Sequence, residues 1–100
     1  MDIAITGFSF LLPGASHIEE LDALLESGQD ALTDPRAAEY LPQEWVSRAG
    51  YVQGAEQFDY DLFGLSLRDS YIIEPQQRMF IQCAWRALEH AGYNPTHCKR

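Results

Sequence analysis

Apolar residues recur at helical spacing between positions 16 and 28. Four aliphatic side chains fall there on one face of a helix: Ile18, Leu21, Leu24 and Leu25. Ser16 and Glu19 have the spacing of a capping box, and Gly28 stands where a left-handed residue ends a helix. The pattern predicts an amphipathic helix that lies on a core.

A second helix is predicted from Glu74 to about Ala91. Pro75 suits the first helical turn, where its missing amide costs nothing, and Gly92 follows the last apolar residue. Apolar residues cover well over one stripe of this helix: Met79, Phe80, Ile81, Cys83, Ala84, Trp85, Ala87, Leu88 and Ala91. A helix with so few polar positions belongs inside a larger body.

Residues 3–8 are the strand candidate, because apolar and β-branched side chains gather there before Pro13-Gly14 breaks the chain. Proline and glycine interrupt residues 29–57, so we expect a long irregular connection there, with a helical turn at 36–41. One strand cannot make a sheet. The pattern therefore fits the beginning of an α/β protein that is incomplete on its own, without an internal boundary in residues 1–100.

Composition and charge narrow the class of partner. The hydrophobic fraction of 46% is normal for a globular chain. Fifteen acidic and seven basic residues give a net charge of −8, and a field of that sign repels nucleic acid and anionic membrane surfaces. The chain starts without a basic, apolar leader and contains no apolar run of about 20 residues, so a cytoplasmic location is predicted.

Cys83 and Cys98 are the two thiols, and their spacing indicates neither a disulfide framework nor a zinc site. Cys83 invites a nucleophile interpretation. Its place in the middle of an apolar helix instead predicts a packed thiol of little reactivity. Cys98 lies beside His97 and Lys99, and an exposed cysteine near an end is preferred there to an activated one.

Other polar residues also have structural interpretations. Asp59 and Asp61 alternate with large apolar residues, as turn and solvent-facing side chains do, rather than forming a pair for acid–base chemistry. Arg78 lies in the first turn of an apolar helix and is predicted to pair with a carboxylate or to cap a loop carbonyl.

His90, His97 and Cys98 match no usual ligand spacing and lack a fourth ligand, so no metal site is predicted. Gly7 and Gly14 fit neither a dinucleotide-binding nor a P-loop pattern. We therefore predict no catalytic, cofactor-binding or metal-binding residue within these 100 residues, and no cofactor.

Three blocks of sequence, in the same order, resemble the β-ketoacyl synthases of polyketide synthases. Residues 74–93 are similar to the family's Asp-Pro-Gln-Gln-Arg segment and the helix after it. Residues 58–68 resemble its Phe-Asp and Phe-Gly-Ile-Ser block, and residues 3–9 with 13–15 are similar to its opening Ile-Ala-Ile and Pro-Gly-Ala block. The sequence departs from the family at Glu74, usually aspartate, and at Leu67, usually proline.

The resemblance implies part of a thiolase-like fold, a homodimer, and partners in an acyl carrier protein and the remaining synthase domains. It adds carrier-protein contact as a second interpretation of Arg78. In the family, a cysteine accepts the acyl chain and two histidines assist its decarboxylative condensation with a malonyl unit. The family motifs around those residues, Thr-Ala-Cys-Ser-Ser, His-Gly-Thr-Gly and Asn-x-Gly-His, do not occur in this sequence.

Two functional hypotheses follow. The chain is either the amino-terminal segment of a condensing enzyme, or a stand-alone, non-catalytic relative that serves as an interaction element in an assembly line. Because the chain ends just before the family's next strand, we expect the first. A chance likeness in an unrelated small helical domain is the third interpretation.

Overall fold

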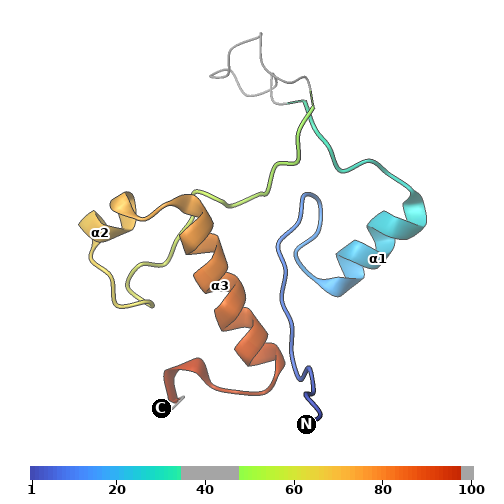
Figure 1. Ribbon diagram of the computed structural model, residues 1–100. Coiled ribbons are helices and arrows are strands. Elements are labelled where there is room, and N and C mark those ends of the chain that lie inside the picture. Colours follow the sequence, from blue (N-terminus) through green and yellow to red (C-terminus); the bar gives the residue numbers. More distant parts are fainter. Residues whose placement is uncertain (35–47, 98–100) are drawn as a thin grey trace. The chain divides into compact units, whose positions relative to one another are not determined.

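The computed structural model describes residues 1–34 and 48–97 of the chain (Figure 1). Its helices, in chain order, are α1 (Ile18–Ser27), α2 (Leu67–Ile72), α3 (Pro75–His90) and the 3-10 helix η2 (Pro95–His97). The chain divides into two compact units, a first unit of Met1–Phe10 with Gly54–Arg100 and a second unit of Leu11–Gln53.

The long helix α3 begins and ends where its sequence predicts. Pro75 occupies its first turn, and the preceding Glu74 has the extended ψ of 144° that a residue before proline favours. At the other end, the Gly92 amide donates to Glu89 and the Tyr93 amide donates to Leu88, each at 2.9 Å. Gly92 has a φ of 82°, which completes a Schellman motif. The predicted helix over 74–91 is thus confirmed.

The short helix α2 was not predicted. The Ser66 side chain caps it by accepting a hydrogen bond from the Asp69 amide at 3.1 Å, and the Ser66 hydroxyl also donates to the Asp69 carboxylate at 2.6 Å. Ile73 ends it with a ψ of 130°, two residues before Pro75. A serine followed three residues later by an acidic residue is the sequence signal that identifies this start.

The predicted strand at residues 3–8 is wrong. No strand forms in residues 1–34 or 48–97, and the isolated bridges there join Leu12 to Ala15 and Thr33 to Ala49. Residues 3–8 therefore have no neighbouring strand to complete a ladder, which a strand requires. The described part of the chain consists of helices, turns and irregular segments, so it does not display the sheet of the predicted α/β class.

Instead, the first segment of the chain approaches the end of α3. A Cβ atom on Gly7 would lie 2.5 Å from the Ala87 carbonyl oxygen and 2.7 Å from the Cβ atom of Ala91. Glycine at position 7 and small residues on α3 are what permit this close approach of two backbones.

Aromatic side chains join residues 54–65 to the middle of α3. Phe58 and Phe63 stack with their ring centroids 5.2 Å apart, and Phe63 meets Trp85 edge to face at 5.5 Å. The Gln82 amide donates to the carbonyl of Gln57 at 3.1 Å. These contacts account for the cluster of large apolar residues that follows the irregular connection.

The second unit is built on a tight turn. Pro13 and Gly14 occupy its centre, Leu12 and Ala15 exchange two backbone hydrogen bonds across it, and Gly14 has the positive φ, 77°, that its position requires. Ala15 is the buried apolar residue here, and a Cβ on Gly14 would lie 3.8 Å from Leu24 of α1. The predicted helix over 16–28 is confirmed.

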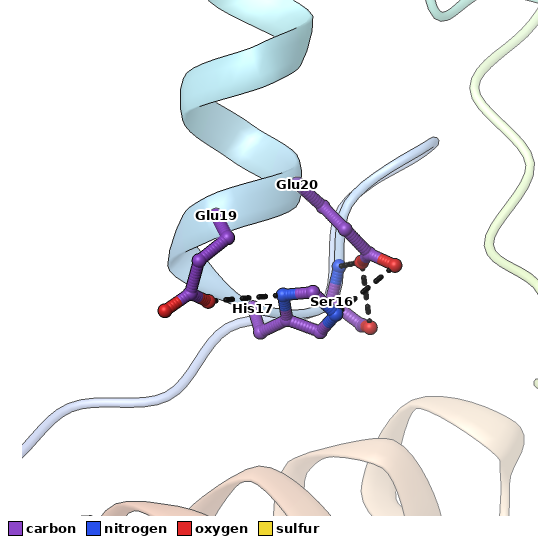
Figure 2. Close-up of polar contacts among 4 residues, drawn as sticks. All are labelled: Ser16, His17, Glu19 and Glu20. Atoms are coloured by element: carbon purple, nitrogen blue, oxygen red, sulfur yellow. Dashed lines mark hydrogen bonds and ion pairs between the residues drawn. The ribbon is translucent and has the colours of Figure 1, made fainter.

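The start of α1 differs from the predicted capping box (Figure 2). Ser16 pairs with Glu20, not Glu19: its amide donates to the Glu20 carboxylate at 2.7 Å and its hydroxyl at 2.9 Å. The N-cap residue is His17, whose side chain makes no capping hydrogen bond. The boundary lies one residue later than a Ser16 cap assumes, so the carboxylate that reaches back is also one residue later.

Arg48 and Asp30 form an ion pair at 2.6 Å, and Arg48 also donates to the carbonyl of Leu32 at 3.3 Å. Thr33 and Ala49 exchange two backbone hydrogen bonds beside this pair. The two described ends of the irregular connection are thereby held together. The predicted helical turn at 36–41 lies outside the described residues.

Replacing Gly7 with alanine is expected to lower the free energy of unfolding by about 1–3 kcal/mol, because the new methyl group would overlap the Ala87 carbonyl. Urea unfolding followed by circular dichroism measures the loss. Thr6→Ala, at the exposed neighbouring position, is the control and is expected to change little. Equal effects of the two substitutions would show that Gly7 is not closely packed.

Candidate functional site

Cys83 lies in the middle of α3 as a half-buried free thiol. Among the described residues, no histidine or carboxylate makes a hydrogen bond with it. A nucleophilic cysteine needs such a base or a cationic neighbour to form its thiolate. That Cys83 is a packed thiol of little reactivity stays a prediction, and Cys98 lies outside the described residues.

The two histidines of the first unit have separate local partners. The Nδ1 atom of His90 accepts a hydrogen bond from the Phe8 amide at 3.1 Å. The Nδ1 atom of His97 lies 2.9 Å from the Thr96 hydroxyl. Within residues 1–34 and 48–97, no group of three or more potential ligands is placed to hold a metal ion.

Asp59 and Asp61 both belong to turns. The Asp59 carboxylate accepts the Leu62 amide at 3.1 Å, and the backbone carbonyl of Asp61 accepts the Gly64 amide at 3.0 Å. These bonds use the aspartates to shape the chain between Phe58 and α2. These two hydrogen bonds do not indicate that the aspartates bind a substrate together.

Arg78 does not have the partner that its sequence predicts. Its Nε atom is buried without a hydrogen-bond partner, and no carboxylate or loop carbonyl in the described part of the chain pairs with its guanidinium group. The prediction of a carboxylate or carbonyl partner is therefore not met within these residues.

Ser16, His17, Glu19 and Glu20 form a polar cluster that sequence reasoning missed (Figure 2). His17 lies between the two carboxylates, with Nδ1 3.2 Å from Glu19 and Nε2 3.1 Å from Glu20. The Ser16 backbone amide, and then the Ser16 hydroxyl, hold the pKa of Glu20 below its usual range. All four side chains are exposed, so this is a helix start rather than a buried reactive site.

Asp30 in the second unit is perturbed in the same direction. The Leu32 amide that donates to its carboxylate is the first cause of a lowered pKa, and the neighbouring Arg48 guanidinium adds to it. An acidic residue 18 positions from its basic partner carries no local sequence signal, which is why this pair was not predicted.

Several apolar side chains of α2 and α3 in the first unit are exposed without a local explanation. Tyr71 and Ile72 of α2 are 81% and 71% exposed, and Phe80 of α3 is 74% exposed. Leu67 of α2 is about half exposed. We call these four residues the uncovered apolar set. A contiguous patch of large apolar side chains is typical of surfaces that bind another part of a protein.

None of the helices in the part of the chain described here has the length and apolar character needed to cross a bilayer.

Comparison with known proteins assigns the whole chain to one family profile. The profile of the β-ketoacyl synthase N-terminal domain matches residues 1–100. The spectinabilin polyketide synthase system protein NorA′ of Streptomyces orinoci is 38% identical over 98 residues, which are 94% of this chain and 3% of that protein.

Other relatives give the same result. Polyketide synthase PksL of Bacillus subtilis is 32% identical over 111 residues, covering 99% of this chain and 2% of the relative. The pikromycin polyketide synthase component PikAII of Streptomyces venezuelae is 33% identical over 105 residues, covering 90% and 3%. The chain thus spans a few hundredths of the length of these relatives.

Acid is expected to weaken the start of α1. A carboxyl group whose folded pKa is lowered stabilises the fold above its unfolded pKa, about 4.3 for glutamate, and loses that contribution as the pH falls through the folded pKa. A carbon-13 titration should give Glu20 a lower midpoint in the folded chain than in urea. Ser16→Ala should move this midpoint part of the way back, because the backbone donor remains.

Ser27→Ala is the matched control, since the Ser27 hydroxyl belongs to the same helix but bonds to the Leu24 carbonyl. An unchanged Glu20 midpoint in Ser16→Ala would contradict the role given to the Ser16 hydroxyl.

Cys83 is expected to be no more reactive than a free thiol toward an acyl thioester. The Cys98→Ser variant leaves Cys83 as the single thiol, and intact-mass spectrometry then counts acyl groups after incubation with a simple acyl thioester. The double variant with Cys83→Ser supplies the blank. Acylation of Cys83 faster than that of free cysteine would contradict this expectation.

Proposed function

The chain belongs to the family of the β-ketoacyl synthase N-terminal domain, and we propose that it is the amino-terminal structural segment of a polyketide-synthase ketosynthase. The observation that supports this proposal most is the match from residue 1 to residue 100, shared with polyketide synthases that are far longer than this chain. Residues 1–100 are taken as one segment of that domain, with no boundary inside it.

The activity we propose for the complete protein is decarboxylative Claisen condensation. An enzyme thiolate first takes the acyl group from its thioester. The malonyl unit on the acyl carrier protein then loses carbon dioxide, and the resulting enolate attacks the enzyme-bound acyl carbon and expels the thiolate. The three motifs expected for that chemistry do not occur among these 100 residues, so the proposal assigns this step to another part of the synthase.

What this segment contributes, in the proposal, is packing surface. Full burial of a large apolar side chain stabilises a fold by roughly 1.5–3 kcal/mol, so the exposed parts of the uncovered apolar set represent on the order of 4–8 kcal/mol. That is comparable to the whole stability of a typical domain. A body that covers α2 and the first turns of α3 would supply this stabilisation.

The proposal includes partners and place. The remaining ketosynthase and polyketide synthase domains cover the segment, the complete enzyme is a homodimer, and the acyl carrier protein delivers its substrate. The location proposed is the cytoplasm, and no cofactor is needed for the reaction as written.

The alternative is a stand-alone, non-catalytic ketosynthase-like scaffold element in a polyketide assembly line. The uncovered apolar set supports it too, because the same side chains would fit a separate polypeptide. The two functions differ in their partner. A structural segment binds a ketosynthase that lacks its own first segment, whereas a scaffold element binds an intact synthase.

The test is complementation. A relative's ketosynthase that lacks its matching first segment is co-expressed with this chain, and we expect the two to co-purify and condensation to be restored. Phe80→Asp should weaken this association by at least about tenfold, because it leaves a charge at a site that becomes buried. Gln77→Asp adds the same charge at another exposed position of α3 and is the matched control.

Failure to bind the shortened ketosynthase, together with binding to the intact enzyme, would replace the proposal with the scaffold alternative. Equal binding by the Phe80 and Gln77 variants would show that the uncovered apolar set is not the surface used.

The isolated chain is expected to be weakly stable or to self-associate, because its uncovered apolar set stays in contact with water. Sedimentation velocity over a range of concentrations measures association, and a thermal melt measures cooperativity. A sharp, cooperative transition from a dilute monomer would contradict the expectation.

A further inference from the structure

Arg78 is a half-buried cation without a compensating charge. Its Nε atom is buried and has no hydrogen-bond partner, and no carboxylate in residues 1–34 and 48–97 forms an ion pair with its guanidinium group. An arginine stays protonated in proteins, so loss of a proton does not remove this charge. We propose that Arg78 is a docking residue, whose guanidinium group binds a carboxylate of the body that covers this segment. That body is the remainder of the ketosynthase in the proposed function, on which the docking role rests.

Arg78 shares a face of α3 with two residues whose polar groups have partners. Gln82 and Trp85 follow it at four and seven positions, the spacing of one helix face. The Gln82 amide donates to the Gln57 carbonyl at 3.1 Å, and the Trp85 indole N–H donates to the Glu89 carboxylate at 2.9 Å. The first unit thus satisfies the polar groups that follow Arg78 on this face, but not the Nε atom of Arg78 itself.

The acidic residues that flank Arg78 along the chain do not pair with it. Glu74 is four residues earlier, but it precedes the first helical turn with an extended ψ of 144°. The Asp69 carboxylate accepts the Ser66 hydroxyl at 2.6 Å, and Glu89 is bonded to the indole as described. The described part of the segment therefore leaves the charge of Arg78 without a counter-charge.

A carboxylate is the group that best fits a guanidinium group. Its two oxygens can accept two parallel hydrogen bonds from the planar fork, and such a pair is stronger than neutral hydrogen bonds. A cation that is partly removed from water costs free energy until an opposite charge faces it. The polyketide synthases that match this chain are far longer, so the synthase beyond these 100 residues can supply the carboxylate.

A permanent partner suits Arg78 better than the acyl carrier protein, which must bind and leave. Charged groups of a transient interface lie mostly in its accessible rim. The Nε atom of Arg78 is instead already covered by the chain's own atoms, and the side chain as a whole is half-buried. A charge in such a place is suited to a contact that forms once, when the ketosynthase folds.

The test repeats the complementation with Arg78→Met, which keeps the length of the side chain and removes its charge. Affinity for the ketosynthase that lacks its first segment should fall by at least about tenfold, the value of a hydrogen bond to a charged group. Arg78→Lys keeps the charge but loses the fork, so its affinity should be intermediate. Arg86→Met, at an exposed position of the same helix, is the matched control and should bind within about threefold of the unmodified chain.

A second measurement separates docking from folding. In the isolated chain, Arg78→Met should keep or raise the urea midpoint, because it removes a buried donor that has no partner. An arginine whose partner lies within this chain would lower the midpoint when it is replaced. In the shortened ketosynthase, replacement of each acidic residue by alanine should identify one whose effect on affinity disappears in the Arg78→Met background.

Three results would overturn the docking role and leave the proposed function in place. One is equal affinity of Arg78→Met and the unmodified chain for the shortened ketosynthase. The second is a lower urea midpoint for Arg78→Met, which would make Arg78 a folding residue of this segment. The third is a loss of carrier-protein binding with unchanged affinity for the shortened ketosynthase, which would assign Arg78 to the carrier protein. Failure of the unmodified chain to bind the shortened ketosynthase would overturn both.

Discussion

The contacts of the first unit depend on α3, and Pro75 sets where this helix begins. Pro75 cannot be preceded by a helical residue without a steric clash, so α2 ends and α3 starts on either side of Glu74. Each residue of an α-helix turns about 100° from the one before it. Trp85 and His90, five residues apart, therefore point about 140° apart around the axis of α3 and contact different segments.

From this start, α3 joins two parts of the chain that are far apart in sequence. Its middle holds residues 57–63 through Gln82 and Trp85, and its end holds residues 7 and 8. The two attachments depend on different kinds of interaction. The first is aromatic packing with one amide hydrogen bond, whereas the second depends on small residues that allow two backbones to approach closely. The second attachment therefore tolerates less added side-chain volume than the first.

Local signals account for the parts of the fold that the sequence predicts. Both long helices carry an apolar face and a glycine at the end, and these are properties of neighbouring residues. The helix α2 was missed because six residues are too few to show a periodic pattern, although the pair Ser66 and Asp69 marks its start. The strand at residues 3–8 was predicted from side-chain type alone, and strand formation depends on a partner that side-chain type does not reveal.

The same limit applies to the candidate site. That Cys83 lies mid-helix follows from the pattern around it, but the partners of His90 and Arg48 are 82 and 18 residues away. Arg78 shows the opposite failure. Its position in an apolar first turn predicts a partner, and the described residues do not supply one. Pairing between residues distant in sequence depends on the complete fold. The partners of such residues are therefore the hardest to predict from the sequence.

The helices differ in the side chains that they expose, and this difference bears on the proposed structural role. The four acidic residues of α1 are exposed, and the base that pairs with two of them is His17 just before the helix. These acidic side chains form a solvated face of the helix. By contrast, α2 and the first turns of α3 expose the uncovered apolar set, which water does not stabilise. Exposed large apolar side chains thus lie on the helices next to Pro75, and α1 adds Leu25 and Ile18. A separate scaffold partner would have to cover that same surface, so a charge placed at Phe80 tests both candidate functions, and the choice of partner decides between them.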